Sequence, residues 1–124
     1  MFLYHWREES QHAILDELEW QREDAKLTTE ARDRAVDELI ELVGAVDGLL
    51  QLQAASDVDY FVRAAGRYFG GDEVQQLRAV VLGAYRWQYI LSGVEEPRFT
   101  EILARMIDDA QGRRIGEALA AIVA

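Results

Sequence analysis

The chain has 124 residues, with 23 acidic and 13 basic side chains, two histidines, one proline and no cysteine. The formal net charge of −10 excludes a general nucleic-acid binder and opposes docking on an anionic membrane surface, because both need cationic residues. The lack of cysteine excludes disulfides, thiolate metal sites and thiol nucleophiles, and fits a cytoplasmic location. The length predicts a single domain, residues 1–124, and a hydrophobic content of 50% is enough for its core.

Helical periodicity dominates the first half of the chain. Residues 2–22 contain no glycine or proline and predict a first helix. Thr28 and Thr29 are candidate caps for a second helix, with Asp47 at the margin of its apolar stripe. Ser56 and Asp59 resemble a capping box, which predicts a third, shorter helix ending at Tyr68. The stripe of the second helix recurs at spacings of three and four: Val36, Leu39, Val43, Val46 and Leu50.

Glycine and proline residues divide the second half of the chain into helices. Gly70-Gly71 precedes a fourth helix that ends at Ser92-Gly93, Pro97 starts a fifth, and Gly112 bends or breaks that last helix. The sequence therefore predicts an all-α fold of about five helices, four long and one short. Charges interrupt every apolar run, so we expect no transmembrane span. The residues expected to face inward on the fourth helix are Val74, Leu77, Val81, Ala84 and Leu91.

One face of the first helix gathers both histidines of the chain. At about 100° per residue, His5, Glu9, His12 and Asp16 share a stripe roughly 60° wide, bordered by aromatic residues such as Trp6. Aromatic borders suggest that these ionisable groups face a covered interior. Imidazole and carboxylate donors on one face suit a divalent first-row metal, and the Glu9/His12 pair is spaced to reach one ion. A solvated or hydrogen-bonded structural cluster would give the same pattern.

These residues resemble a known superfamily. Glu9-Ser10-Gln11-His12 matches the Glu-x-x-His signature of ferritin-like di-iron carboxylate proteins, and the longer pattern that begins at His5 is similar to a helix of the aryl-amine N-oxygenase branch. The resemblance covers about the first sixteen residues. It implies a ferritin-like helical bundle with iron or manganese, in which Glu9 bridges or chelates the metal and His5 and His12 are terminal ligands. It also implies oxygen-dependent oxidation of a substrate that the sequence does not name.

The chain departs from that family in its ligand count. Such sites take two Glu-x-x-His helices and two further glutamates, whereas no histidine follows His12. Three explanations stay open: a homodimer shares one site, the chain lacks N-terminal helices of a larger fold, or the match is accidental. The alternative function is a non-catalytic helical interaction or dimerisation domain. Residues 1–53 hold 13 acids and 5 bases, a net −8 of the total −10, which favours cation binding in this half.

Four aromatic residues are candidates for a substrate pocket: Trp6, Tyr85, Trp87 and Tyr89. Large amphipathic aromatics more often belong to a core or an interface, and that interpretation is favoured here. Arg86, beside Trp87, could orient a ligand or bond a neighbouring carbonyl. The sequence has no nucleophile elbow and no Gly-rich phosphate loop, and no motif for a nucleotide, flavin or haem.

Overall fold

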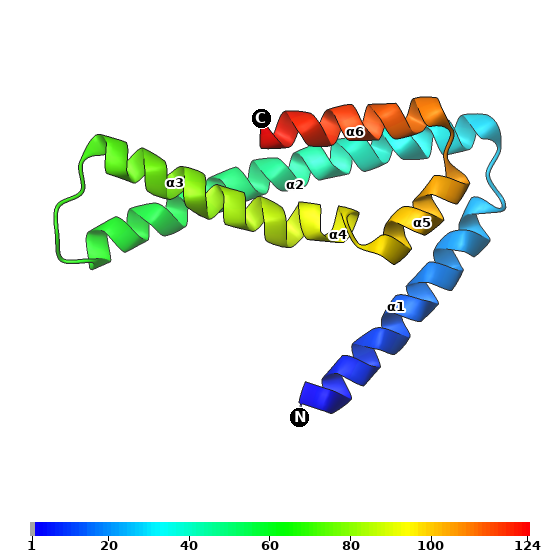
Figure 1. Cartoon of the computed structure of the whole chain (residues 1–124), viewed down its shortest axis with the longest axis horizontal. Coiled ribbons are helices and arrows are strands. Elements are labelled where there is room, and N and C mark those ends of the chain that lie inside the picture. Colours follow the sequence, from blue (N-terminus) through cyan, green and yellow to red (C-terminus); the bar gives the residue numbers. More distant parts are fainter. Residues whose placement is uncertain (1) are drawn as a thin grey trace. The chain divides into compact units, whose positions relative to one another are not determined.

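The computed structural model describes residues 2–124, which contain helices and no strand (Figure 1). The all-α prediction is confirmed, and the helices within residues 36–124 form a bundle. The chain divides into two compact units, Met1–Ala35 and Val36–Ala124. Each unit is described by itself.

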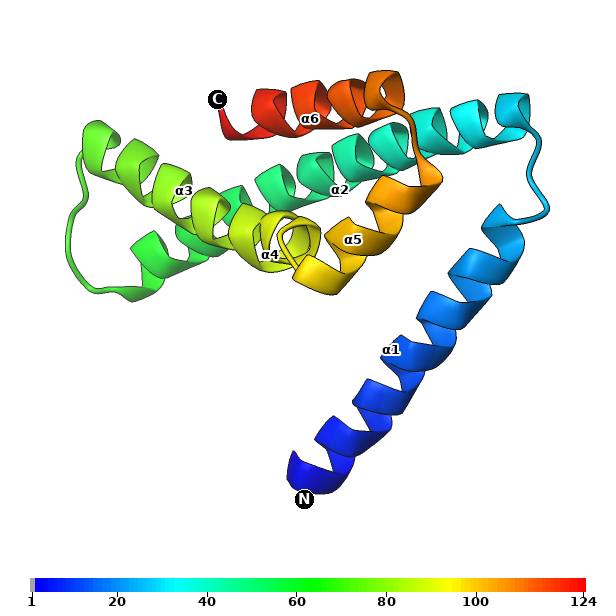
Figure 2. The same cartoon turned by 45° about the vertical axis from the view of Figure 1, so that its right-hand side comes forward.

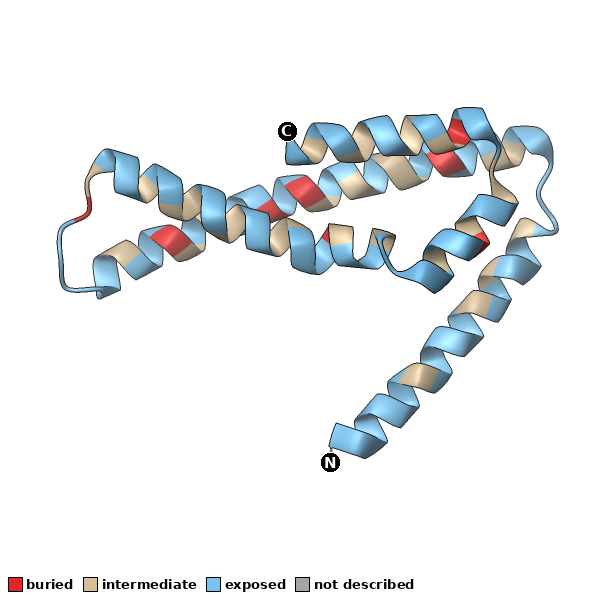
Figure 3. Ribbon diagram, viewed as in Figure 1, coloured by how far each residue is buried: buried red, intermediate tan, exposed pale blue. Residues whose placement is uncertain are grey.

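The first unit consists of α1 (Phe2–Asp24) and the start of α2, so the predicted first helix is two residues longer than expected. The Thr28 hydroxyl accepts a hydrogen bond from the Ala31 N–H at 3.2 Å, which makes Thr28 the cap. The Arg32 guanidinium binds the Asp24 carboxylate at 2.8 and 3.1 Å across the turn between the helices. This hydrogen bond raises the pKa of Arg32. Within the described residues, α1 contains no buried side chain (Figure 3).

Helix α2 (Thr29–Ala64) continues for 36 residues, so the prediction of a separate third helix starting at Ser56 is wrong. Buried Ala54 and Val58 extend the apolar stripe through that region, and side-chain packing outweighs the weak capping signal. Asp59, the supposed partner in the capping box, pairs with Arg78 at 2.6 Å instead. The predicted stripe is otherwise confirmed, with Val36 and Leu50 buried.

Helix α2 is also long and apolar enough to cross a membrane. An 18-residue window has a mean hydropathy of 1.2, and 17% of that window is buried. Core helices of water-soluble proteins and N-terminal signals meet the same test of length and composition, so this is weak evidence for a span.

Helices α3 (Gly71–Arg86), η1 (Trp87–Leu91) and α4 (Ser92–Val94) follow one another without a gap and run antiparallel to α2 (Figure 1). The segment η1 is a π-helix, closed by the Ser92 N–H donating to the Trp87 carbonyl. Gly66, with φ of 69°, makes the turn after α2 in a backbone conformation that glycine adopts without strain. Ala84 is exposed and Ile90 is buried, so the expected inward position of Ala84 is wrong.

Two helices complete the second unit, α5 (Pro97–Met106) and α6 (Asp109–Val123). Pro97 begins α5 as predicted, but the break lies at Ile107 and Asp108, and Gly112 is inside α6. The Asp108 carboxylate accepts from the Gln111 N–H at 2.8 Å, while the Gln111 side chain accepts from the Asp108 N–H at 3.1 Å. This reciprocal capping box fixes the start of α6, which lies beside α2 within the second unit in both views (Figure 1 and Figure 2).

Removing this cap tests where α6 begins. Asp108→Ala should lower the free energy of unfolding by about 1 kcal/mol, because it leaves the first N–H groups of α6 without their acceptor. The control Asp109→Ala removes the same charge one residue later and should cost less than about half as much. Urea denaturation followed by circular dichroism measures both. Equal losses would show that Asp108 acts only through its charge.

The core of the second unit is formed mainly by α2 and the helices beside it. A small cavity of about 40 Å³ lies between α2, α4, α5 and α6 and is lined by apolar side chains, among them Leu39, Phe99 and Leu119. Such a lining keeps a cavity dry. Seven hydrophobic residues are buried in the described chain: Val36, Leu50, Ala54, Val58, Phe69, Ile90 and Ile102.

Candidate functional site

Glu9 lies between the two histidines on α1. Its Oε1 atom is 3.9 Å from Nδ1 of His5, and its Oε2 atom is 3.6 Å from Nδ1 of His12. The helix sets this arrangement, because positions three and four residues apart lie on the same face. The structure thus brings together three of the four predicted ligands. Asp16 is one turn further along and is exposed, and it makes no hydrogen bond or ion pair within residues 2–124.

The separations bear on whether these residues fit a metal ion. Two donors at about 2.1 Å from one ion lie roughly 3 to 3.5 Å apart. The Glu9–His12 pair is close to that range, while the His5–Glu9 distance exceeds it by a few tenths of an ångström. Nevertheless, no group of three or more His, Cys, Asp or Glu residues positioned to hold a metal occurs in the described chain. The residues therefore fit part of a metal site rather than a complete one.

Exposure of these side chains differs from the sequence prediction. The side chains of His5, Glu9 and His12 are 69%, 57% and 56% exposed. The covered interior expected from the aromatic borders is therefore wrong for the isolated chain, since Trp6 in that border is itself exposed. An aromatic residue beside a polar stripe does not determine what lies opposite the helix.

A second cluster joins α2 to α3. The Arg86 guanidinium donates to both carboxylate oxygens of Asp47, at 2.6 and 2.9 Å, and Gln51 donates to the same carboxylate at 2.7 Å. The Arg86 hydrogen bonds hold the pKa of Asp47 below its usual value although burial opposes this, and Asp47 raises the pKa of Arg86. Asp47 and Arg86 are therefore a charged pair that fixes the pairing of the two helices. Arg86 serves neither of the roles predicted for it.

A third cluster lies further along the same pair of helices. The Tyr85 hydroxyl donates to Asp57 at 2.5 Å, and Gln53 donates to the other Asp57 oxygen at 2.8 Å. These bonds, the Tyr85 bond first, lower the pKa of Asp57, and the bond to Asp57 raises the pKa of Tyr85. Gln53 and Asp57 are four residues apart, so helical geometry alone brings them together, but pairing Asp57 with Tyr85 requires the register of α2 against α3.

The predicted aromatic pocket forms only in part. Tyr85 and Tyr89 line one groove and meet edge to face, with ring centroids 6.2 Å apart. Trp87 is half exposed and does not line that groove, and Trp6 is exposed on α1.

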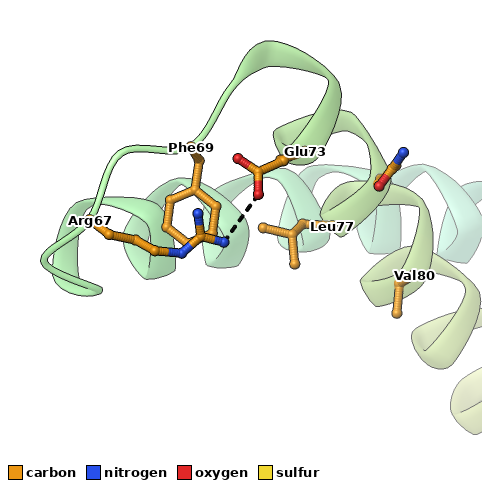
Figure 4. A pocket seen from close by; sticks show the side chains of 6 residues that line it. Arg67, Phe69, Glu73, Leu77 and Val80 are labelled. Atoms are coloured by element: carbon orange, nitrogen blue, oxygen red, sulfur yellow. Dashed lines mark hydrogen bonds and ion pairs between the residues drawn. The ribbon is translucent and has the colours of Figure 1, made fainter.

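The turn between α2 and α3 forms a shallow pocket of about 270 Å³ (Figure 4). The Arg67 guanidinium lies over the Phe69 ring, 3.6 Å from its centroid, and donates to Glu73 at 3.2 Å. Glu73 also accepts from the Gly70 N–H at 2.9 Å, and this bond is the main reason its pKa is lowered. Because the charged groups of the pocket satisfy each other, we assign it to the structure of the turn.

We compared the chain with protein families, curated proteins and solved structures. No family model, curated protein or solved structure matches the chain.

Proposed function

We propose that this chain is a ferritin-like helical protein whose α1 contributes half of a non-haem metal site. A second copy of the chain completes the site, and we place the protein in the cytoplasm. The observation that carries this proposal is the position of the Glu9 carboxylate, with one oxygen toward each of two imidazoles. A glutamate three residues before a histidine, as Glu9 is before His12, often occurs by chance. Three donors on one face of a helix that buries no side chain occur by chance less often.

Each residue has a chemical role in this proposal. Glu9 supplies an anionic oxygen that would balance a metal's charge, and His5 and His12 supply nitrogen donors. Asp16 extends the acidic face and would act as a further oxygen donor from the second copy or as an attractor for the cation. Iron or manganese, once bound, would supply oxygen-dependent oxidation chemistry. The chain's own residues hold the ion, and their exposure leaves room for a second helix to approach.

Metal content measured with solution mass tests the proposal. After anaerobic exposure to ferrous iron, or to Mn²⁺, we expect metal in the dimer fraction and none in the monomer. Glu9→Gln and His12→Ala should each abolish uptake while helix content stays unchanged, because their side chains are exposed. The matched control Glu8→Gln removes one charge from the same helix, about 100° around the helix axis from Glu9. This variant should still take up metal. Binding below about 0.1 equivalent in the unaltered protein would refute the metal site.

The second candidate is a non-catalytic assembly domain, favoured by the apolar surface that α1 exposes. Leu3, Ile14 and Leu18 are between 55% and 59% exposed, although helices of soluble proteins usually cover such residues. In this case His12→Ala should alter the monomer–dimer equilibrium without any change in metal content. A strictly monomeric solution mass would exclude this function.

A further inference from the structure

A groove of about 760 Å³ runs between α2 and the α3–η1 helix, within the second unit. Leu49 and Leu52, which are 65% and 71% exposed, form an apolar wall on the α2 side. Tyr85 and Tyr89 line the other side and present aromatic surface. Its volume is within the range of small-molecule sites, about 300 to 1,000 Å³.

Asp57 is the acidic group of this groove. Among the described residues that line the groove, it carries the only formal charge. Its two hydrogen-bond donors, Gln53 and Tyr85, are neutral, and they stabilise the carboxylate without cancelling its charge. A carboxylate accepts about four hydrogen bonds, so further acceptor positions remain.

Three other aspartates of α2 have arginine partners. Asp47 binds Arg86 and Asp59 binds Arg78, both at 2.6 Å, and Asp37 lies 3.2 Å from Arg114. Asp57 differs because its donors are uncharged and it opens onto a groove. Its negative charge is thus available to a cation from outside the chain.

We propose that this groove binds a small organic amine with an apolar body. The ammonium group would donate to Asp57 and lie beside the tyrosine rings, which attract cations through their electron-rich faces. The apolar body would cover Leu49 and Leu52, where burial of hydrocarbon is favourable. Charge complementarity selects this ligand class, because the groove offers an anion and aromatic surface with no cationic side chain among its described lining residues.

The test uses the full chain with hexylammonium as the probe, in the presence of a chelator so that the result is independent of any metal at α1. Tyrosine ring signals in NMR titrations report binding. We expect hexylammonium to shift the Tyr85 and Tyr89 signals with an affinity at least about tenfold greater than that of hexanol. Hexanoate, which has the opposite charge, should not bind. Equal affinity for hexanol, or no shift at about 50 mM hexylammonium, would overturn the proposal.

Two variants identify the groups responsible. Asp57→Asn keeps a hydrogen-bond acceptor but removes the charge, and it should weaken hexylammonium binding by about tenfold or more. The control Glu41→Gln removes the same charge from an exposed position of α2 outside the groove, and it should change affinity less than about twofold. Tyr89→Leu replaces a 66% exposed ring without disturbing the core and should weaken binding several-fold. Unchanged affinity in Asp57→Asn, or an equal loss in Glu41→Gln, would refute the site.

Discussion

Asp47→Ala should lower the free energy of unfolding by about 2–4 kcal/mol, because it leaves the Arg86 guanidinium between two helices without its anion. The range lies slightly below that of fully enclosed ion pairs, since the Arg86 side chain keeps 21% of its surface exposed and the Asp47 side chain keeps 9%. Urea denaturation measures the loss. Replacing both residues, as Asp47→Leu with Arg86→Met, should recover most of it because neither charge then remains unpaired.

Asp59→Ala is the matched control on the same helix. Asp59 also pairs with an arginine of α3 at 2.6 Å, but the two side chains are 50% and 36% exposed, so we expect a loss below about 1 kcal/mol. Equal losses at Asp47 and Asp59 would show that burial does not distinguish the two pairs.

Acid should remove the contribution of Asp47. The pKa of Asp47 is lowered in the folded chain from the ordinary value of 3.8, mainly by hydrogen bonds from Arg86. The stabilisation is therefore present above that value and is lost as the pH falls through the lower, folded-state pKa. The stability difference between the unaltered protein and Asp47→Ala should be full at neutral pH and smaller at about pH 3.

Ile102→Ala should lower the free energy of unfolding by about 2–4 kcal/mol, because it deletes buried methyl and methylene groups and leaves a cavity. Ile102 is 3% exposed and is the buried residue of α5, a helix of ten residues. So short a helix depends on packing for its stability, so the loss should also reduce helix content before global unfolding.

Ile14→Ala provides the control for this prediction because it deletes the same atoms from a residue that is 59% exposed. We expect a change within about 0.5 kcal/mol for the monomer. Both variants are compared by thermal and urea denaturation at low protein concentration. Similar losses of unfolding free energy at the two positions would show that burial of Ile102 does not stabilise α5.

The helical periodicity predicted the elements better than their boundaries. Pro97 and Gly70-Gly71 act through local backbone chemistry, so their effects are readable from the sequence. The weak cap at Ser56 was outweighed by the continuing burial of Ala54 and Val58, which depends on tertiary packing. The break at Asp108 is a capping box with Gln111, and the Asp108–Gln111 spacing is a local signal for it that the sequence contains.

The two candidate sites differ in how far the sequence could predict them. His5, Glu9 and His12 lie within two turns of one helix, so their proximity follows from helical geometry alone. Their exposure does not, because it depends on elements elsewhere in the chain or on a partner. The Asp57–Tyr85 and Asp47–Arg86 contacts span 28 and 39 residues, and they depend on the register of two antiparallel helices. Periodicity gives the face of each helix but not that register.

The π-helical segment Trp87–Leu91 sets the rotational phase of the helix that contains it. A π-helical turn holds one residue more than an α-helical turn, and each residue of an α-helix advances it by about 100°. The segment therefore rotates the short continuation Ser92–Val94 relative to its position in an uninterrupted α-helix. The number of residues in this segment consequently affects the face on which Val94 lies, and Val94 lines the apolar cavity of the second unit. A one-residue deletion there would turn Val94 away from the apolar cavity that it lines, whereas the polar turn before α2 would absorb the same change.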